Sequence, residues 1–168
     1  MMRPEKGCTE DNLLHVEKRL AGLPARWSDG ILKFVDACQE RFDVVAIILV
    51  GSVARGTWTP ASDIDLLVIS DDLPADFFER LLELSHLRPE LVPLEILGYT
   101  TAEYAQMFSN GSVTFLYALA FGIPLVGVEW FKTQRKRFDE WVELGLTRTN
   151  CSWVLPPNVK RQQGDIVP

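Results

Sequence analysis

The sequence is poor in the residues that bind zinc or form disulfides. Among 168 residues there are three cysteines and two histidines. Cys8, Cys38 and Cys151 lie far apart and form no Cys-x-x-Cys pair, so neither a zinc site nor a disulfide framework is expected. We expect reduced thiols, with Cys38 on the apolar face of a helix.

Long apolar runs are also absent. The longest, Val44 to Val50, has the length of a strand and is far too short to cross a bilayer. The first residues, MMRPEKGCTEDNLL, lack the apolar core of a signal peptide. We therefore expect no membrane association and a cytoplasmic location.

Positive charge is scarce. Lys and Arg number 17 against 23 Asp and Glu, a formal net charge of −6. This balance argues against general nucleic-acid binding, which needs a basic surface. The one basic run, Lys132 to Arg137, is predicted to be the solvated face of a helix, with docking to an acidic partner or an RNA as the alternative.

Two common phosphate-binding motifs are missing. The sequence contains no G-x-x-x-x-G-K-[ST] and no G-x-G-x-x-G after a strand, so neither a P-loop nor a dinucleotide-binding fold is supported. It also shows no repeat of solenoid length.

The patterns that are present predict an α/β (α+β) fold, with a small mixed β-sheet flanked by helices. Strands are expected at VVAIILV, DIDLLVIS and VPLEILGY, with an edge strand at IPLVGV. The link between the first two strands holds about a dozen residues, which is short for a parallel crossover, so these strands should be antiparallel. Helices are expected over 9–20, from an N-cap at Ser28, and from Asp72 with Pro74 in the first turn. Further helices are expected after a capping box formed by Thr100 and Glu103, over 112–121, and over 129–146. The core candidates of the last helix are Trp130, Phe131, Phe138, Trp141, Val142 and Leu144.

The most informative stretch is GSVARGTWTPASDIDLLV, residues 51–68. Side chains two apart on a strand point to one side of a sheet, so Asp63 and Asp65 should project together. Charge is costly to bury unless it is paired. Two neighbouring carboxylates are therefore typical of a site for a divalent cation such as Mg²⁺, which prefers oxygen ligands. A solvated strand edge is the alternative for an isolated pair.

Three further features fit that interpretation. Glu95 stands in an apolar strand and could face the same cleft as a third carboxylate, with a strand residue that faces solvent as the alternative. Gly51 and Ser52 follow a strand, where a backbone free of a side chain and a hydroxyl can approach a phosphate. Arg55 could neutralise phosphate charge or brace the loop, although a plain surface arginine is the alternative.

The set Gly51, Ser52, Asp63, Asp65 and Glu95 resembles the DNA polymerase β nucleotidyltransferase superfamily, and in particular its minimal nucleotidyltransferase (MNT) branch. The resemblance covers residues 44–99, and one departure is Glu95, where the superfamily often has Asp. It implies a polymerase β palm-like fold, whereas the helices before Asp43 and after Thr100 resemble the family only loosely. The length and hydrophobic content indicate a single domain over 1–168. Within that domain we expect N-terminal helices over 1–43, a catalytic core over 44–99, C-terminal helices over 100–150 and a tail over 151–168.

The resemblance also implies a reaction. A nucleoside monophosphate, AMP if the substrate is ATP, would pass to an acceptor hydroxyl with release of pyrophosphate. Asp63 and Asp65 would bind two Mg²⁺ ions, Glu95 would bind the ion that activates the hydroxyl, and Gly51 and Ser52 would hold the β- and γ-phosphates.

The acceptor stays open at this point. Small members of the branch adenylylate a HEPN-type toxin as its antitoxin, and others modify small hydroxylated molecules such as aminoglycosides. The short chain favours a separately encoded protein acceptor or a site built by a homodimer. A catalytically inactive nucleotide- or partner-binding module of the same fold is the alternative from another class.

Overall fold

The computed structural model describes residues 18, 20–149 and 152–157. Its centre is a mixed four-stranded sheet in the order β3-β2-β1-β4. Strand β1 is antiparallel to both β2 and β4, whereas β2 and β3 are parallel. The strands are β1 (Val44–Val50), β2 (Ile64–Ser70), β3 (Leu94–Tyr99) and β4 (Ile123–Val126). The predicted fold class, the antiparallel first pair and the edge position of IPLVGV are therefore confirmed.

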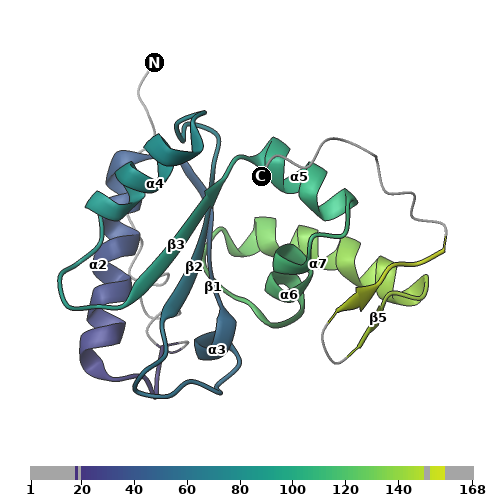
Figure 1. Cartoon of the computed structure of the whole chain (residues 1–168), viewed down its shortest axis with the longest axis horizontal. Helices are drawn as coiled ribbons and strands as arrows, with labels where there is room; N and C mark the ends of the chain where they lie inside the picture. The colour runs from purple at the N-terminus through teal and green to yellow at the C-terminus, as the bar shows by residue number, and fades with distance from the viewer. Residues whose placement is uncertain (1–17, 19, 150–151, 158–168) are drawn as a thin grey trace.

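Helices cover both faces of the sheet (Figure 1). Helices α2 (Ala25–Arg41) and α4 (Phe77–His86) lie on one face, and the short α3 (Gly51–Ala54) follows β1 directly. Helices α5 (Thr101–Ser109), α6 (Val113–Phe121) and α7 (Val128–Glu143) lie on the other face. A small hairpin of β5 (Thr147–Arg148) and β6 (Trp153–Val154) packs beyond α6 and α7.

The two faces of the sheet belong to separate hydrophobic clusters because side chains alternate along a strand. Ile47, Leu66 and Ile96 pack with α2 and α4. Ile48 and Leu67 instead pack with α5, α6 and α7. Val44–Val50 is thus covered on both sides, which explains its continuous apolar sequence.

The apolar stripe predicted for the second helix is confirmed. Its members are all buried: Ile31, Phe34, Val35, Cys38 and Phe42. Cys38 is a free thiol, and burial raises its pKa to about 12.

Two predicted helix starts are wrong. Helix α2 begins at Ala25, so Ser28 lies within it and does not cap it. Helix α4 begins at Phe77, and its N-cap is Asp76, whose side chain accepts hydrogen bonds from the backbone N–H groups of Phe78 and Glu79. Asp72 instead accepts a hydrogen bond from the backbone N–H of Asp43 (2.9 Å) and one from the Ser70 hydroxyl.

The expectations for the C-terminal part are confirmed only in places. Phe131 and Phe138 of α7 are buried and Trp130 and Trp141 are partly buried, as predicted. Val142 and Leu144 are 47% and 56% exposed and are not core residues. Val142 lies in the last turn of α7, beyond the buried residues Phe131, Gln134 and Phe138, and Leu144 lies after the helix ends at Glu143.

Within the predicted tail 151–168, Trp153–Val154 forms β6 of the hairpin. Most of the helix expected over 9–20, residues 9–17 and 19, and the end of the tail, 158–168, lie outside the described residues; Lys18 is helical and Leu20 is not.

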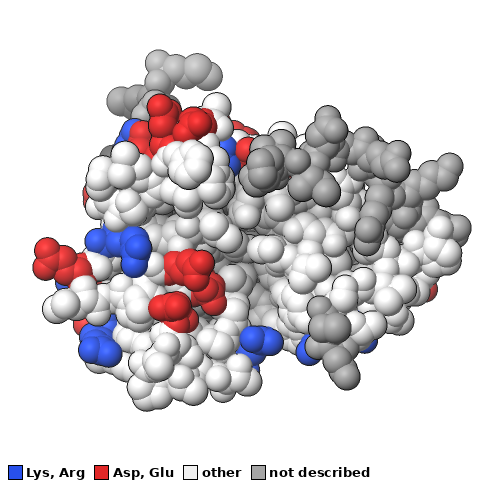
Figure 2. All heavy atoms as spheres, in the orientation of Figure 1, with Lys and Arg blue, Asp and Glu red and all other residues white. Residues whose placement is uncertain are grey.

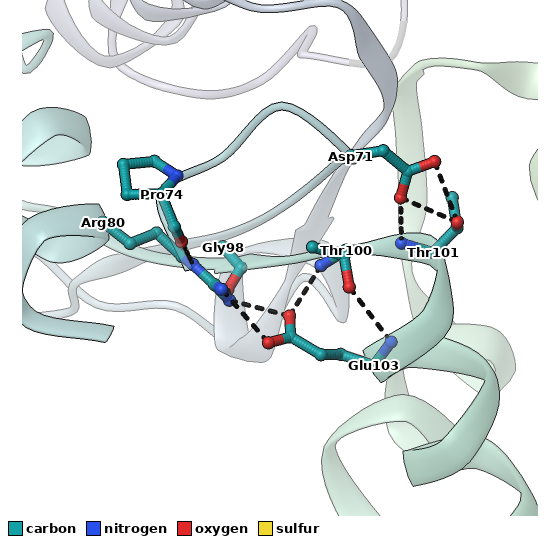
Figure 3. A network of polar contacts seen from close by, with 7 residues as sticks. All are labelled: Asp71, Pro74, Arg80, Gly98, Thr100, Thr101 and Glu103. Carbon is teal, nitrogen blue, oxygen red and sulfur yellow. Dashed lines mark hydrogen bonds and ion pairs between the residues drawn. The ribbon is translucent and has the colours of Figure 1, made fainter. Parts of the chain in front are cut away.

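A polar network holds α4 and α5 at the end of β3 (Figure 3). The Arg80 side chain is only 3% exposed, and its guanidinium donates to the carbonyls of Pro74 (3.0 Å) and Gly98 (2.9 Å) and to both carboxylate oxygens of Glu103 (2.8 and 3.1 Å). Glu103 also accepts from the backbone N–H of Thr100, whose hydroxyl accepts from the backbone N–H of Glu103. The predicted capping box is therefore confirmed, and it is continuous with a buried arginine that fixes α4 against β3.

Candidate active site

The candidate site lies at the end of the sheet where β1 finishes and β2 and β3 begin. Gly51 follows β1 with a backbone φ of +70°, a left-handed conformation that residues with a side chain rarely adopt. A Cβ at Gly51 would overlap the Asp65 carboxylate, at 2.8 Å from its Cγ. Glycine is thus needed here for two reasons, the turn and the closeness of Asp65. The second reason left no signal in the sequence, because it depends on the strand register.

Asp65 and Glu95 are lateral neighbours. The register of the parallel strands β2 and β3 pairs Asp65 with Glu95, so both side chains point to the face covered by α5, α6 and α7. The pKa of Asp65 is raised, first by burial, next by the charges of Glu95 and Asp63, and by a hydrogen bond with Glu95. The structure therefore brings the two carboxylates together at an electrostatic cost.

Asp63 stands just before β2 and is exposed. It is close enough for its charge to act on Asp65. The beginnings of the two strands are joined by a hydrogen bond from the Ile64 N–H to the Pro93 carbonyl (2.8 Å), which holds Asp63 and Glu95 at the same end of the sheet. The three predicted acidic residues thus lie at the same end of the sheet.

Within the described part of the chain, no three His, Cys, Asp or Glu side chains are grouped tightly enough to hold a metal ion by themselves. Mg²⁺ usually binds through one or two carboxylates together with substrate phosphates. A bound cation would also remove the repulsion that raises the pKa of Asp65. The donor set therefore fits a magnesium–nucleotide complex rather than a closed structural metal site.

Arg55 braces the turn and also acts on the acidic cluster. Its Nε donates to the Gly51 carbonyl (3.2 Å), and its positive charge lowers the pKa of Asp65 against the larger effects that raise it. Ser52 lies in the first turn of α3, and its carbonyl accepts from the backbone N–H of Thr57 (3.0 Å). Both residues thus lie beside the carboxylates, at the loop that leads from β1 to β2.

The surrounding surface shows the same arrangement. Figure 2 shows acidic side chains gathered over the lower parts of β2 and β3, beside a hollow that separates them from the half of the molecule formed by α6, α7 and β5. A substrate that enters the hollow would therefore meet an acidic wall on the sheet side and a different wall on the helical side. None of the helices in the described part of the chain is long and apolar enough to span a membrane.

Residues 31–106 match the model of a family described as a nucleotidyltransferase domain. This central segment is thus similar to nucleotidyltransferase domains. The match contains all six candidate residues, from Gly51 to Glu95, and confirms the superfamily that the sequence resembles. The matched segment runs from within α2 to within α5 and includes every strand of the four-stranded sheet apart from β4.

The chain is also similar to individual proteins. Over 50 residues it is 46% identical to a candidate protein adenylyltransferase from Methanocaldococcus jannaschii, a match that covers 29% of this chain and 34% of the other. The chain thus spans about a third of the length of that curated relative.

Two solved structures show a weaker likeness. One, a toxin–antitoxin complex with AMP-PNP, is 16% identical, with coverage of 67% of this chain and 86% of that chain and a TM-score of 0.47. The other, a tri-AMPylated Shewanella oneidensis HEPN toxin in complex with its MNT antitoxin, is 14% identical, with coverage of 70% and 89% and a TM-score of 0.43.

Proposed function

We propose that the nucleotidyltransferase domain transfers AMP from ATP to a hydroxyl group on a partner protein, with a HEPN-like toxin as the acceptor. The observation that carries the proposal is the contact between Asp65 and Glu95 beside Gly51 and Asp63, because such a cluster is unfavourable until positive charge reaches it. The family match over the same residues supports nucleotidyl transfer, and the similarity to a candidate protein adenylyltransferase supports a protein as the acceptor.

In this proposal Asp63, Asp65 and Glu95 hold two Mg²⁺ ions together with the triphosphate. When bound, Mg²⁺ neutralises phosphate charge and lowers the pKa of the acceptor hydroxyl. Glu95 accepts the proton of that hydroxyl, whose oxygen forms a bond to the α-phosphorus. The bond from the α-phosphorus to the bridging oxygen breaks, and pyrophosphate leaves. Catalysis of this kind consists of positioning and charge stabilisation.

The other residues orient the nucleotide. Gly51 lets the backbone approach the β- and γ-phosphates without a side chain in the way, and Ser52 adds a hydroxyl in the first turn of α3. Arg55 keeps the turn in place through its hydrogen bond to the Gly51 carbonyl. The backbone at 51–55 therefore acts as a fixed support for the leaving pyrophosphate.

The test is transfer of label from ATP labelled at the α-phosphate, with Mg²⁺, to proteins encoded beside this chain. Asp65→Asn should abolish transfer while the protein stays folded. A matched control is Asp71→Asn. Asp71 lies directly after β2, just as Asp63 lies directly before β2, but the Asp71 carboxylate binds Thr101 at the other end of the sheet. Labelling of aminoglycoside-like small molecules alone would refute the protein acceptor. Mg²⁺-dependent nucleotide binding without transfer to any acceptor would establish an inactive module instead.

A further inference from the structure

The loop over residues 55–63 connects α3 to β2, so it runs from the turn at Gly51 to the carboxylate of Asp63 and has both ends at the candidate site. Most of this loop is exposed, and within it only Trp58 and Ser62 are not. Trp58 is also its only large apolar side chain. A loop with so little buried surface needs specific contacts to keep one conformation, because the entropy of the free chain opposes it.

Trp58 supplies such a contact. Its indole packs against the hydrophobic cluster on the α2 face of the sheet, and its ring centroid lies 5.2 Å from that of Trp27, with the two planes tilted by 54°. Trp27 stands in the first turn of α2 and is only 1% exposed. The loop is therefore attached through one partly buried ring to a ring that is fixed in the core.

The indole reaches the core from behind the carboxylates. Asp65 points to the face of the sheet covered by α5, α6 and α7. Its neighbours Ile64 and Leu66 belong to the opposite cluster, against which Trp58 packs. Trp58 and the carboxylates thus lie on opposite faces of the sheet, and any effect of the indole on the site has to pass through the backbone of the loop.

Hydrogen bonds on both sides of the indole connect it to the ends of the loop. On one side the Thr57 N–H donates to the Ser52 carbonyl (3.0 Å). On the other side the Thr59 N–H donates to the Ser62 hydroxyl (2.9 Å), and the Ser62 N–H donates to the Thr59 carbonyl (2.9 Å). Ser62 directly precedes Asp63. The two residues that flank the indole are therefore bonded to the first turn of α3 and to the residue before the first carboxylate.

We propose that Trp58 is a positioning residue, whose packing on Trp27 holds the loop in the conformation that binds Mg²⁺ and the triphosphate. The loop in turn keeps Ser52 and Asp63 in place. This inference rests on the proposed function, since it concerns the same site. It extends the support of that site to Trp27, which lies outside the matched segment 31–106. Because the loop is fixed before the nucleotide arrives, less of it has to be ordered on binding.

The test is calorimetric titration of AMP-PNP with Mg²⁺ into the full chain and its variants, at a temperature well below the Tm of each. Trp58→Ala should raise the Kd about tenfold, the rise expected if the freed loop spends about a tenth of its time in the binding conformation. Trp58→Phe should restore the Kd to within about threefold, because a phenyl ring can still pack on Trp27. Trp58→Leu keeps apolar bulk at this position and should lie between the two, and it carries the comparison if the alanine variant does not fold.

The matched control is Trp141→Ala. Trp141 is also partly buried and also packs on one aromatic ring, Phe108 at 4.5 Å, but it joins α7 to α5 rather than the loop to α2. Its removal should lower Tm and change the Kd by less than about twofold, as expected for independent sites. Hydrogen exchange of peptides that cover the loop should be faster in Trp58→Ala and unchanged in Trp141→Ala.

Failure of this inference is distinguishable from failure of the proposed function. If the unaltered chain binds AMP-PNP and Trp58→Ala binds it equally well, or if Trp141→Ala weakens binding as much, the role of Trp58 is refuted and the proposed function stands. Unchanged hydrogen exchange of the loop in Trp58→Ala, or a Trp58→Phe variant as weak as Trp58→Ala, would also refute it, because packing on Trp27 would then not hold the loop. No Mg²⁺-dependent AMP-PNP binding by the unaltered chain would overturn both.

Discussion

Two glycines with nearly the same backbone conformation allow a sharp test of the site. Gly51 has a φ of +70° and Gly56 a φ of +69°. A Cβ at Gly56 would meet nothing within 4 Å, whereas a Cβ at Gly51 would overlap the Asp65 carboxylate. Alanine at either position therefore costs the same backbone strain, and only alanine at 51 also moves Asp65.

The expected losses of stability and activity follow from two effects, the backbone strain and the displacement of Asp65. A left-handed conformation costs a residue with a side chain about 1–2 kcal/mol. In a chain of this size, 1 kcal/mol corresponds to roughly 2–4 °C in Tm. Gly56→Ala should therefore lower Tm by a few degrees and leave AMP transfer unchanged. Gly51→Ala should lower Tm by at least as much and reduce transfer about 100-fold, the scale of a 1 Å misplacement in an active site.

The assays are thermal melting and labelled-ATP transfer on both variants side by side. Equal transfer rates in Gly51→Ala and Gly56→Ala would refute the reasoning, because the contact between Gly51 and Asp65 would then have no bearing on the site. A loss in both variants would mean that backbone strain alone disturbs the loop between β1 and β2.

Three further predictions concern stability and reactivity. Arg80→Ala should lower the free energy of unfolding, measured by urea titration, by roughly 2–4 kcal/mol. This loss is smaller than that for a fully buried ion pair, because the Glu103 side chain is 41% exposed. A loss under about 1 kcal/mol would contradict a stabilising role of the network in Figure 3. Burial alone would raise the pKa of Glu103, but hydrogen bonds from Arg80 and Thr100 outweigh it and lower that pKa, so this stabilisation is present above the unfolded pKa and is lost as pH falls through the folded pKa. The difference in urea midpoint between the unaltered chain and Glu103→Gln should accordingly shrink on acidification. A difference that stays constant with pH would contradict a lowered pKa of Glu103 in the folded protein. Cys38, whose pKa burial raises to about 12, should resist thiol reagents until the protein unfolds, and peptide-level labelling of the folded chain at Cys38 would show otherwise.

Much of the sheet was predictable from local patterns. The run Val44–Val50, the antiparallel return to Ile64 and the edge strand at Ile123 follow from apolar runs and link lengths. The register that sets Asp65 beside Glu95 does not follow from such patterns, because pairing between β2 and β3 depends on how α4 packs across the sheet. The sequence could supply the types of residue at the site and their order along the chain, but not their contact.

Helix starts show a second limit. Ser28, Asp72 and Asp76 are all residues that cap helices, and only Asp76 does so. A signal for Asp76 was present, since Glu79 follows at the spacing of a capping pattern. Asp72 was the wrong choice because its carboxylate is taken by Ser70 and by the Asp43 backbone, a tertiary contact that local sequence does not reveal.

The hairpin was missed for a different reason. Strands β5 and β6 have two residues each, too short for any periodic pattern to appear. Its contact with Tyr117 of α6 joins segments that are distant in the sequence, and local sequence does not reveal such a contact.

The central claim is that the carboxylates beside Gly51 hold a nucleotide together with Mg²⁺. Calorimetric titration of AMP-PNP into the unaltered chain and into Asp65→Asn, each with Mg²⁺ and with EDTA, tests it most directly. The account predicts binding to the unaltered chain that needs Mg²⁺ and disappears in Asp65→Asn, while the variant melts no lower because a repelled, half-buried charge has been removed. Binding of equal strength in EDTA, or undiminished binding by Asp65→Asn, would contradict it.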